Sequence, residues 1–151
     1  MNISTLMQRD VVTVRAFDEL VAAAKVMRQR HVGYLIVTEP DLASGDEKPV
    51  GVITDRDIVV TVVAPGENPQ ALRVGDVMTR QPVTVQETEP VGTALREMRR
   101  IGVRRLPIVG TRGELRGVLS LDDVLDSLAG VFDDVKGTMR AGRRTEAALR
   151  P

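Results

Sequence analysis

The sequence predicts an α+β fold that is built from two tandem copies of one unit. Residues 6–14 match residues 77–85, with Met, Arg, Val, Thr and Val recurring at an offset of 71 positions. Residues 51–58 match residues 117–124 at an offset of 66, so the second copy has lost residues between the two blocks. The 151 residues are 42% hydrophobic and 28% charged, which is typical of a globular protein of this length. The chain is therefore predicted to be a duplicated globular protein.

The first half of each unit is predicted to be a strand followed by an amphipathic helix. Leu20, Ala24 and Met27 are spaced four and then three residues apart, which places them on one face of a helix. The second copy carries the same spacing 71 positions later. The predicted strands cover residues 11–14 and 83–85, and the predicted helices cover about residues 18–31 and 90–101.

The second half of each unit is predicted to be two strands and a closing helix. Residues 58–63 are all β-branched, which by propensity alone favours a strand. Their counterpart, residues 124–129, is compatible with a helix, and both segments follow a capping sequence, so a helix is predicted in each copy. The predicted strands cover residues 34–38, 50–53, 106–109 and 116–119, and the predicted helices cover residues 55–64 and 121–129.

The duplication also predicts the organisation of the chain. Residues 39–49, the excess in the first copy, are rich in Asp, Glu, Pro, Ser and Gly and are predicted to form an exposed loop. The last residues have a modest apolar periodicity and a basic end, which favours a helix. The predicted units are the first repeat at residues 1–64, a linker at 65–72, the second repeat at 73–130 and a C-terminal helical tail at 131–151.

Composition excludes several classes of function. The absence of cysteine excludes disulfides, thiolate metal sites and a cysteine nucleophile, and the single histidine builds neither a zinc site nor a triad. We therefore predict no metal and no catalytic residue. Equal numbers of basic and acidic residues, 21 of each, and only three aromatic residues make nucleic acid an unexpected main partner. With no signal peptide and no bilayer-spanning run, we expect a cytoplasmic protein without membrane contact.

The doubled pattern resembles a tandem pair of CBS domains, a Bateman module. The resemblance covers about residues 1–130 and rests on the repeated Gly-x-h-h-[Thr/Ser]-x-x-Asp block and on residues 78–85 and 104–109. The first copy departs from the family pattern, with Val11 in the place of Pro82. The resemblance implies a stand-alone CBS pair whose repeats are related by a pseudo-twofold axis. It further implies a homodimer formed through helical faces and adenosine-containing ligands in the clefts between the repeats.

The chemistry of Thr54 and Asp57 favours such a ligand independently. Thr54 ends a strand and opens a helix, where free N–H groups favour an anion and its hydroxyl can donate to a phosphate. Asp57 lies one turn later and is an acceptor for the two hydroxyls of a ribose. Ser120 and Asp123 repeat the arrangement. The same residues match a helix-capping box, so a purely structural role stays open.

Charge distinguishes the two predicted sites. Arg56 lies between cap and acid in the first copy and favours a phosphate, whereas Asp122 holds that place in the second copy and repels one. Arg104 and Arg105 offer compensating charge, and apolar residues beside the first strands, together with Tyr34, can sandwich an adenine ring or simply pack in the core. The predicted ligand-binding residues are Val12, Tyr34, Thr54, Arg56, Asp57, Val83, Arg104, Arg105, Ser120 and Asp123.

The function that we expect is a non-catalytic regulatory sensor that requires no cofactor and binds AMP, ADP, ATP or S-adenosylmethionine. Such a sensor works only if its ligand prefers one arrangement of the repeats over another. The alternative is a ligand-free structural or adaptor dimer whose Thr/Ser-x-x-Asp motifs are helix caps. The sequence does not identify a regulated partner protein.

Overall fold

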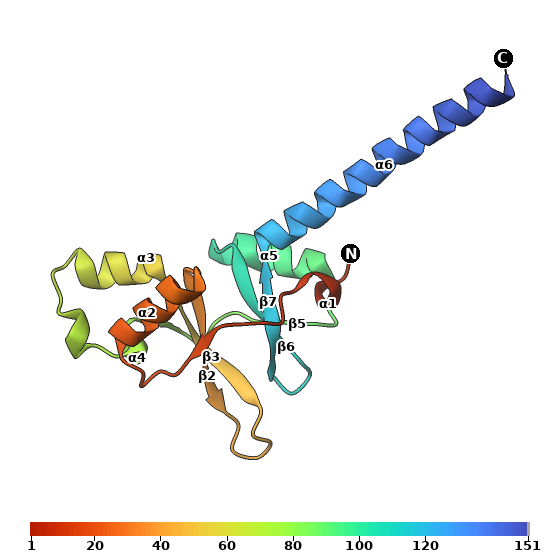
Figure 1. Ribbon diagram of the computed structural model, residues 1–151. Helices are drawn as coiled ribbons and strands as arrows, with labels where there is room; N and C mark the ends of the chain where they lie inside the picture. Colours follow the sequence, from red (N-terminus) through yellow and green to blue (C-terminus); the bar gives the residue numbers. More distant parts are fainter. Residues whose placement is uncertain (151) are drawn as a thin grey trace.

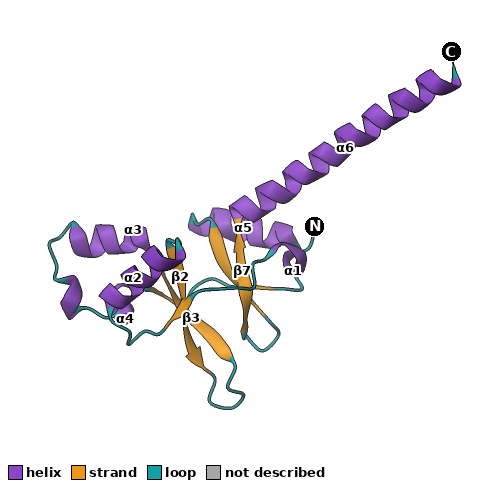
Figure 2. Cartoon of the chain, in the orientation of Figure 1, coloured by secondary structure: helices purple, strands orange, loops and turns teal. Residues whose placement is uncertain are grey.

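The computed structural model describes residues 1–150. The body contains two sheets, and one long helix projects away from it (Figure 1). The strand order is β1-β2-β3-β4 in the first sheet and β5-β6-β7 in the second. In each sheet the first two strands are parallel and the next pair is antiparallel. Helices pack beside both sheets (Figure 2), which confirms the α+β fold of two tandem repeats.

The order strand–helix–strand–strand–helix is present in both repeats. The first repeat contains β1 (Thr13–Val14), α2 (Leu20–Arg30), β2 (Tyr34–Pro40), β3 (Glu47–Thr54), α3 (Asp55–Ile58) and the π-helical segment η1 (Val59–Val63). The second repeat contains β5 (Val85–Gln86), α5 (Val91–Ile101), β6 (Arg105–Val109), β7 (Leu115–Ser120) and α6 (Leu121–Leu149). The short elements α1 (Ile3–Leu6), η2 (Pro69–Ala71), α4 (Val74–Val77) and β4 (Thr79–Arg80) lie at the start of the chain and between the repeats.

The two hydrophobic cores are interlocked. Ile3 and Met7, from the start of the chain, are buried in the core of the second repeat against residues of α5, β6 and β7. Val74 and Met78 are buried in the core of the first repeat. On α2 the fully buried face contains Leu20, Ala23 and Met27, so Ala23 takes the place predicted for Ala24, which is half-buried. Each repeat is therefore completed by the segment that precedes the other.

The segments that precede the two repeats also pair with the sheets at equivalent positions. Gln8 pairs with Val118 beside β7, and Thr79 pairs with Val52 on β3. These two pairs are equivalent positions, because the offsets of 71 and 66 found in the sequence convert one pair into the other. The two repeats are thus related by an approximate twofold operation, and the segment that crosses between them runs along the edge of each sheet.

The β-branched segment after Thr54 is helical, as predicted, but it widens into a π-helix. The backbone N–H of Ala64 donates to the carbonyl of Val59 at 2.9 Å, a spacing of five residues. Thr61 Oγ1 donates to the Asp57 carbonyl at 2.5 Å and competes with the backbone ladder in the same turn. Crowding by β-branched side chains and this extra donor to the Asp57 carbonyl explain the wider turn.

Residues 39–49 were predicted to form an exposed loop, and this expectation was wrong at both ends of the segment, where residues 39–40 and 47–49 belong to strands. Strand β2 continues to Pro40, β3 begins at Glu47, and only a turn separates them. Arg15 holds the extension by a paired contact with Glu47, Nη1 to Oε2 at 2.5 Å and Nη2 to Oε1 at 2.7 Å, and also donates to the Thr38 carbonyl at 3.0 Å. This contact joins the residue after β1 to the turn end of the hairpin, where Glu47 pairs with Pro40.

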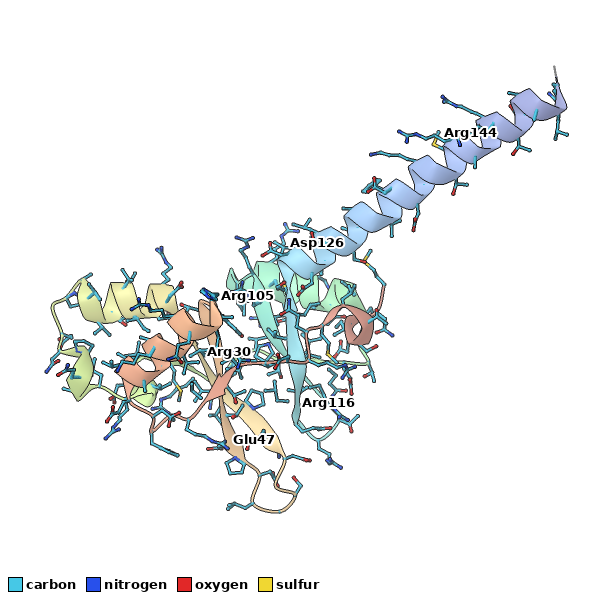
Figure 3. The ribbon with its side chains drawn as sticks, in the orientation of Figure 1. Arg30, Glu47, Arg105, Arg116, Asp126 and Arg144 are labelled. Carbon is cyan, nitrogen blue, oxygen red and sulfur yellow. The ribbon has the colours of Figure 1, made fainter. Side chains whose placement is uncertain are left out.

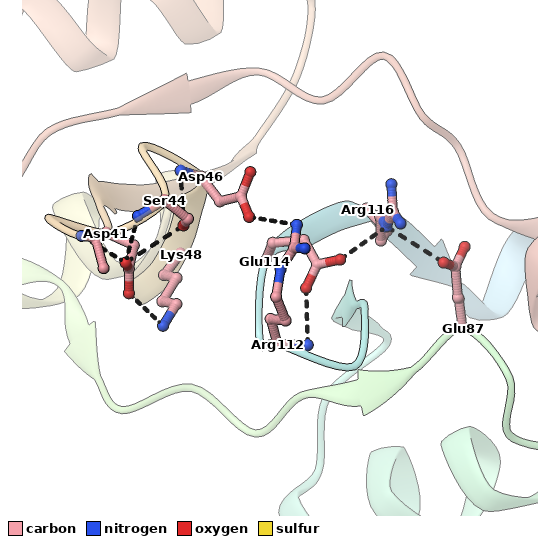
Figure 4. Close-up of polar contacts among 9 residues, drawn as sticks. Asp41, Ser44, Asp46, Lys48, Glu87, Arg112, Glu114 and Arg116 are labelled. Carbon is pink, nitrogen blue, oxygen red and sulfur yellow. Dashed lines mark hydrogen bonds and ion pairs between the residues drawn. The ribbon is translucent and has the colours of Figure 1, made fainter.

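The turn of this hairpin is fixed by Asp41 and touches the second repeat (Figure 4). The Asp41 carboxylate accepts from the backbone of Ala43 and Ser44 and from Lys48 Nζ at 2.6 Å, which holds its pKa well below the usual range. Asp46 then pairs with Arg112 Nη2 at 2.7 Å. A solvent-exposed ion pair of this kind contributes little stability, but it connects the tips of the two hairpins.

Helix α6 joins the predicted closing helix and the predicted tail into one element. It begins at Leu121 and ends at Leu149, a length of about 44 Å for its 29 residues at ~1.5 Å each. Gly130 does not interrupt it, because a single glycine costs a helix only about 1 kcal/mol. Pro151 lies outside the described residues. Within residues 1–150, we find no helix with both the length and the apolar character that a bilayer crossing requires.

Candidate functional site

A cleft of about 850 Å³ lies between the repeats. The β3–α3 junction forms one wall, the segment that follows β4 forms a second, and the turn between α5 and β6 forms a third. Both repeats therefore contribute to one cavity. Seven of the ten predicted ligand-binding residues line it, namely Tyr34, Thr54, Arg56, Asp57, Val83, Arg104 and Arg105.

The Thr54–Asp57 pair forms a capping box and retains spare polar atoms. Thr54 N donates to Asp57 Oδ2 at 2.9 Å, and Asp57 N donates to Thr54 Oγ1 at 3.1 Å. Among residues 1–150, no side chain or backbone group donates to Asp57 Oδ1, and the Thr54 hydroxyl proton has no acceptor. The cap therefore uses one carboxylate oxygen and leaves the other, together with a hydroxyl donor, available to a ligand.

The cleft gathers positive charge from three arginines. Arg104 Nη2 pairs with Asp122 Oδ1 at 2.8 Å. Within the described chain, no carboxylate lies at ion-pair distance from Arg56 or Arg105, and both are exposed. Figure 3 shows Arg105 between the two halves of the body. Two guanidinium groups are thus free to meet an anion at the mouth of the cleft.

Tyr34 and Arg105 occupy equivalent positions in the two repeats and meet at the centre. The Arg105 guanidinium carbon lies 5.8 Å from the centroid of the Tyr34 ring, a cation–π geometry. Burial raises the pKa of Tyr34 above its ordinary value of 10.0, and the charge of Arg105 opposes this shift. The Tyr34 hydroxyl is buried without a hydrogen-bond partner among residues 1–150. This neutral phenol is a donor that the protein leaves unused in the wall of the cleft.

The apolar wall combines predicted and unpredicted residues. Val83 packs against the second core and also lines the cleft beside Pro82. Val12, its equivalent, packs against the first core and does not line this cleft. Pro82 is one of the apolar residues beside the first strands that were predicted as a surface for an adenine ring. The lining residues that were not predicted are Gly33, Val52, Asp55, Thr79, Gln81, Ile101, Gly102, Val103, Leu106 and Pro107.

Close packing explains one of these omissions. A Cβ added to Gly33 would come within 2.5 Å of Asp55 Oδ2, so glycine lets the α2–β2 turn approach the start of α3. Gly33 and Asp55 are not matched by glycine or acid in the second repeat, where Arg104 and Leu121 stand. The sequence does not reveal this contact, because Gly33 and Asp55 lie in two different turns that only the fold brings together.

Ser120 and Asp123 lie outside the cleft described above and form a closed network. Ser120 N and Oγ donate to Asp123 Oδ2 at 3.0 and 2.5 Å, and Gln8 Nε2 donates to Asp123 Oδ1 at 2.9 Å. Partial burial raises the pKa of Asp123, but the hydrogen bonds from Ser120 and Gln8 and the charge of Arg105 lower it, with a net lowering. Both oxygens of this acid are engaged within the protein.

The open site can hold a molecule with hydroxyls, an anion and an apolar ring. Its volume lies within the range of about 300–1,000 Å³ that is usual for small-molecule sites. Acceptor, donors, guanidinium groups and an apolar wall are present together in this cleft. Among residues 1–150, no group of three or more His, Cys, Asp or Glu side chains is placed to hold a metal ion.

Comparison with known proteins gives a consistent result. The CBS domain family model matches residues 3–64 and 74–130. An uncharacterized protein from Methanopyrus kandleri is 36% identical over 125 residues, which cover 82% of this chain and 61% of that protein, so this chain spans less than two thirds of its relative. A CBS domain protein from Pyrobaculum aerophilum, complexed with AMP, is 28% identical with a TM-score of 0.71 and covers 82% of this chain and 89% of its own. A hexameric CBS-CP12 protein from bloom-forming cyanobacteria is also 28% identical, with a TM-score of 0.72, covering 99% and 84%.

Proposed function

The chain belongs to the CBS domain family, and on that premise we propose that it is a non-catalytic regulatory module that binds an adenine nucleotide between its repeats. The observation that carries this proposal is the partition of the Asp57 carboxylate. Oδ2 caps a helix, whereas Oδ1 faces no donor in the described chain and belongs to a residue that lines the cleft. A carboxylate oxygen of this kind is the acceptor that ribose hydroxyls require.

The remaining groups fit the other parts of a nucleotide. Arg56 and Arg105 are free guanidinium groups that offer paired N–H donors to a phosphate. Pro82 and Val83 form an apolar surface for the base. The AMP complex of the Pyrobaculum aerophilum relative supports a monophosphate as the ligand class. We therefore propose AMP as the first ligand to test, ahead of ADP, ATP and S-adenosylmethionine.

Regulation follows from the position of the cleft. Tyr34, Thr54 and Asp57 belong to the first repeat, whereas Val83 and Arg105 belong to the second. A ligand that touches both favours one relative arrangement of the repeats by the difference between its affinities for the two arrangements. The protein then transmits occupancy as a change in shape.

A ligand-free adaptor is the second candidate, and the capping boxes favour it. Both junctions carry the complete reciprocal pair of hydrogen bonds, so each motif has a structural role without a ligand. The two candidates differ in what Asp57 does beyond capping. Only the nucleotide proposal gives its second oxygen a role.

Thermal unfolding with AMP, ADP, ATP or S-adenosylmethionine tests the proposal. AMP should raise the melting temperature of the wild type, because binding to the native state stabilises it by RT ln(1 + [L]/Kd). Asp57→Asn keeps one oxygen as the acceptor for the cap and replaces the other oxygen with an N–H donor. Without ligand this variant should melt almost as the wild type does, and most of the AMP-induced rise in melting temperature should vanish.

Asp76 offers a matched control, because its Oδ2 caps α4 by accepting from Arg73 N at 2.7 Å and it does not line the cleft. Asp76→Asn should keep the full AMP shift. A wild type that shows no shift with any of the four ligands, or an Asp57→Asn variant that retains the wild-type shift, would return the molecule to the adaptor candidate.

A further inference from the structure

Helix α6 carries an exposed apolar stripe that the body does not cover. Leu125, Phe132, Val135 and Met139 are 52, 65, 51 and 59% exposed, and Leu128 between them is 36% exposed. Their positions are separated by three, four, three and four residues. This is the heptad spacing with which one helix packs along another. The stripe is therefore a seam, here called the α6 seam, rather than scattered surface residues.

The free part of α6 is poorly suited to stand alone. From Leu128 onward every described residue of the helix is exposed. Gly130, Gly137 and Gly142 lie in this part, and each destabilises a helix by about 1 kcal/mol relative to alanine. Most helical stability in proteins comes from packing of an apolar face, and within residues 1–150 nothing covers the apolar face of this part. The α6 seam thus needs an occupant.

Charge along α6 identifies the occupant and its direction. Residues 121–134 contain five aspartates and no basic residue, whereas residues 135–149 contain one lysine, three arginines and one glutamate. Asp126 lies near the body and Arg144 lies far along the projecting part (Figure 3). A second copy aligned in parallel would place like charges together, whereas an antiparallel copy places the acidic half of each helix against the basic half of the other.

We propose that the α6 seam binds the same seam of a second copy in antiparallel orientation. Heptad layers then match when Leu128 faces Met139 of the second copy and Phe132 faces Val135 of the second copy. These four positions all lie in the exposed part of the helix, so the register uses the length that the body leaves free. In this register Asp122, whose Oδ1 already pairs with Arg104 of its own chain, lies beside Arg143 of the second copy and adds an attraction on the flank of the seam.

The same register accounts for the glycines. Gly130 and Gly137 fall on the face opposite the seam, where a missing side chain costs no contact between helices. Gly142 falls in the seam and faces Leu125 of the second copy, where its small size leaves room for the leucine. A contact through body helices, as the CBS resemblance implies, involves other surfaces and is compatible with this one.

Disulfide trapping tests orientation and register in a chain that has no cysteine of its own. Leu128→Cys combined with Met139→Cys in one chain should give a cross-linked dimer under mild oxidation. Each single variant should cross-link at least about tenfold less, because equivalent positions lie apart in an antiparallel pair. The matched control, Ser127→Cys with Ala141→Cys, has nearly the same axial positions on the outer face and should stay uncross-linked.

Sedimentation equilibrium supplies the second measurement. Phe132→Glu should halve the assembly mass or weaken association by about tenfold or more, whereas Gly137→Glu, which adds the same charge on the outer face, should not. Efficient cross-linking of the single variants would show a parallel pair and overturn the proposal. A wild-type mass that Phe132→Glu leaves unchanged, without cross-linking of the double-cysteine chain, would mean that the seam does not bind a second copy.

Discussion

The junction at Thr54 and the junction at Ser120 have the same backbone geometry but engage their acids differently. In both, a hydroxyl residue in extended conformation caps a helix and the acid three residues later completes the capping box. Asp57 keeps one carboxylate oxygen free of protein donors, whereas Asp123 receives Gln8 on that oxygen. Duplication thus preserved the fold of the junction and left a carboxylate oxygen without a protein donor, among residues 1–150, at the first junction only.

The residues beside the acids sharpen this contrast. Arg56 is unpaired among residues 1–150 and lines the cleft, whereas its equivalent Asp122 is paired with Arg104. The first junction presents a free cation and a free acceptor, and the second presents groups already matched to one another. A capping box can therefore leave one oxygen of its acid unused, as at Asp57, or have both oxygens engaged by the protein, as at Asp123.

The largest expected effect on stability comes from disrupting the contacts between a strand of one repeat and the segment that precedes the other repeat. This effect should differ between the two repeats. A Cβ on Gly117 would come within 2.5 Å of the Gln8 carbonyl oxygen, whereas a Cβ on Gly51 would first meet the Sδ of Met78 at the same distance. A methionine side chain can move and a paired backbone cannot. We expect Gly117→Ala to cost about 2–3 kcal/mol of unfolding free energy and Gly51→Ala about half of that. Urea unfolding of both variants measures the difference, and equal costs would contradict the asymmetry.

The acids of the two junctions should contribute differently to the free energy of unfolding. Asp123→Asn puts an amide donor among Ser120 N, Ser120 Oγ and Gln8 Nε2 and should cost about 1–2 kcal/mol, because at least one of these donors loses its acceptor. Asp57→Asn retains an acceptor for Thr54 N and should cost only about 0.5 kcal/mol. Chemical denaturation without ligand separates the two. A larger loss at Asp57 than at Asp123 would show that the first junction is the structural one.

Local patterns predicted the repeated unit well. Helical spacing, the matched glycine blocks and the capping sequences placed every long helix and strand, because each of these signals acts over one or two turns of chain. The sequence also pointed to Thr54, Asp57 and Arg105, which the structure places along one cleft. Their role in binding stays a prediction.

What could not be predicted depends on contacts between distant segments. Met7 packs in the second core and Met78 in the first, and a linear comparison of the repeats does not reveal this exchange. The comparison shows only that Met7 and Met78 are equivalent to each other. The same exchange brings Gln8 to Asp123 and closes the second junction. The extended hairpin depends on Arg15 reaching Glu47, a pair separated by 32 residues. Sequence offsets reveal which segments of the two repeats are equivalent, but not which segment packs against which repeat.

The smallest expected effect is a pH dependence that belongs to Asp123. Hydrogen bonds from Ser120 and Gln8 outweigh burial and lower the pKa of this acid below its ordinary value of 3.8. A lowered folded-state pKa stabilises the protein fully above 3.8, and this stabilisation is lost as the pH falls through the folded pKa. The stability deficit of Asp123→Asn relative to the wild type should therefore be constant near neutral pH and shrink below 3.8.

Gln8→Ala removes one of the donors to Asp123, so the folded-state pKa of Asp123 should move closer to its ordinary value of 3.8. The range of pH over which the folded and unfolded states bind different numbers of protons should then be narrower. Urea unfolding of the wild type and both variants between about pH 6 and about pH 3 measures both effects. A deficit of Asp123→Asn that does not change across that range would show that the carboxylate gains nothing from its charge, and the closed network at the second junction would then be a matter of shape alone.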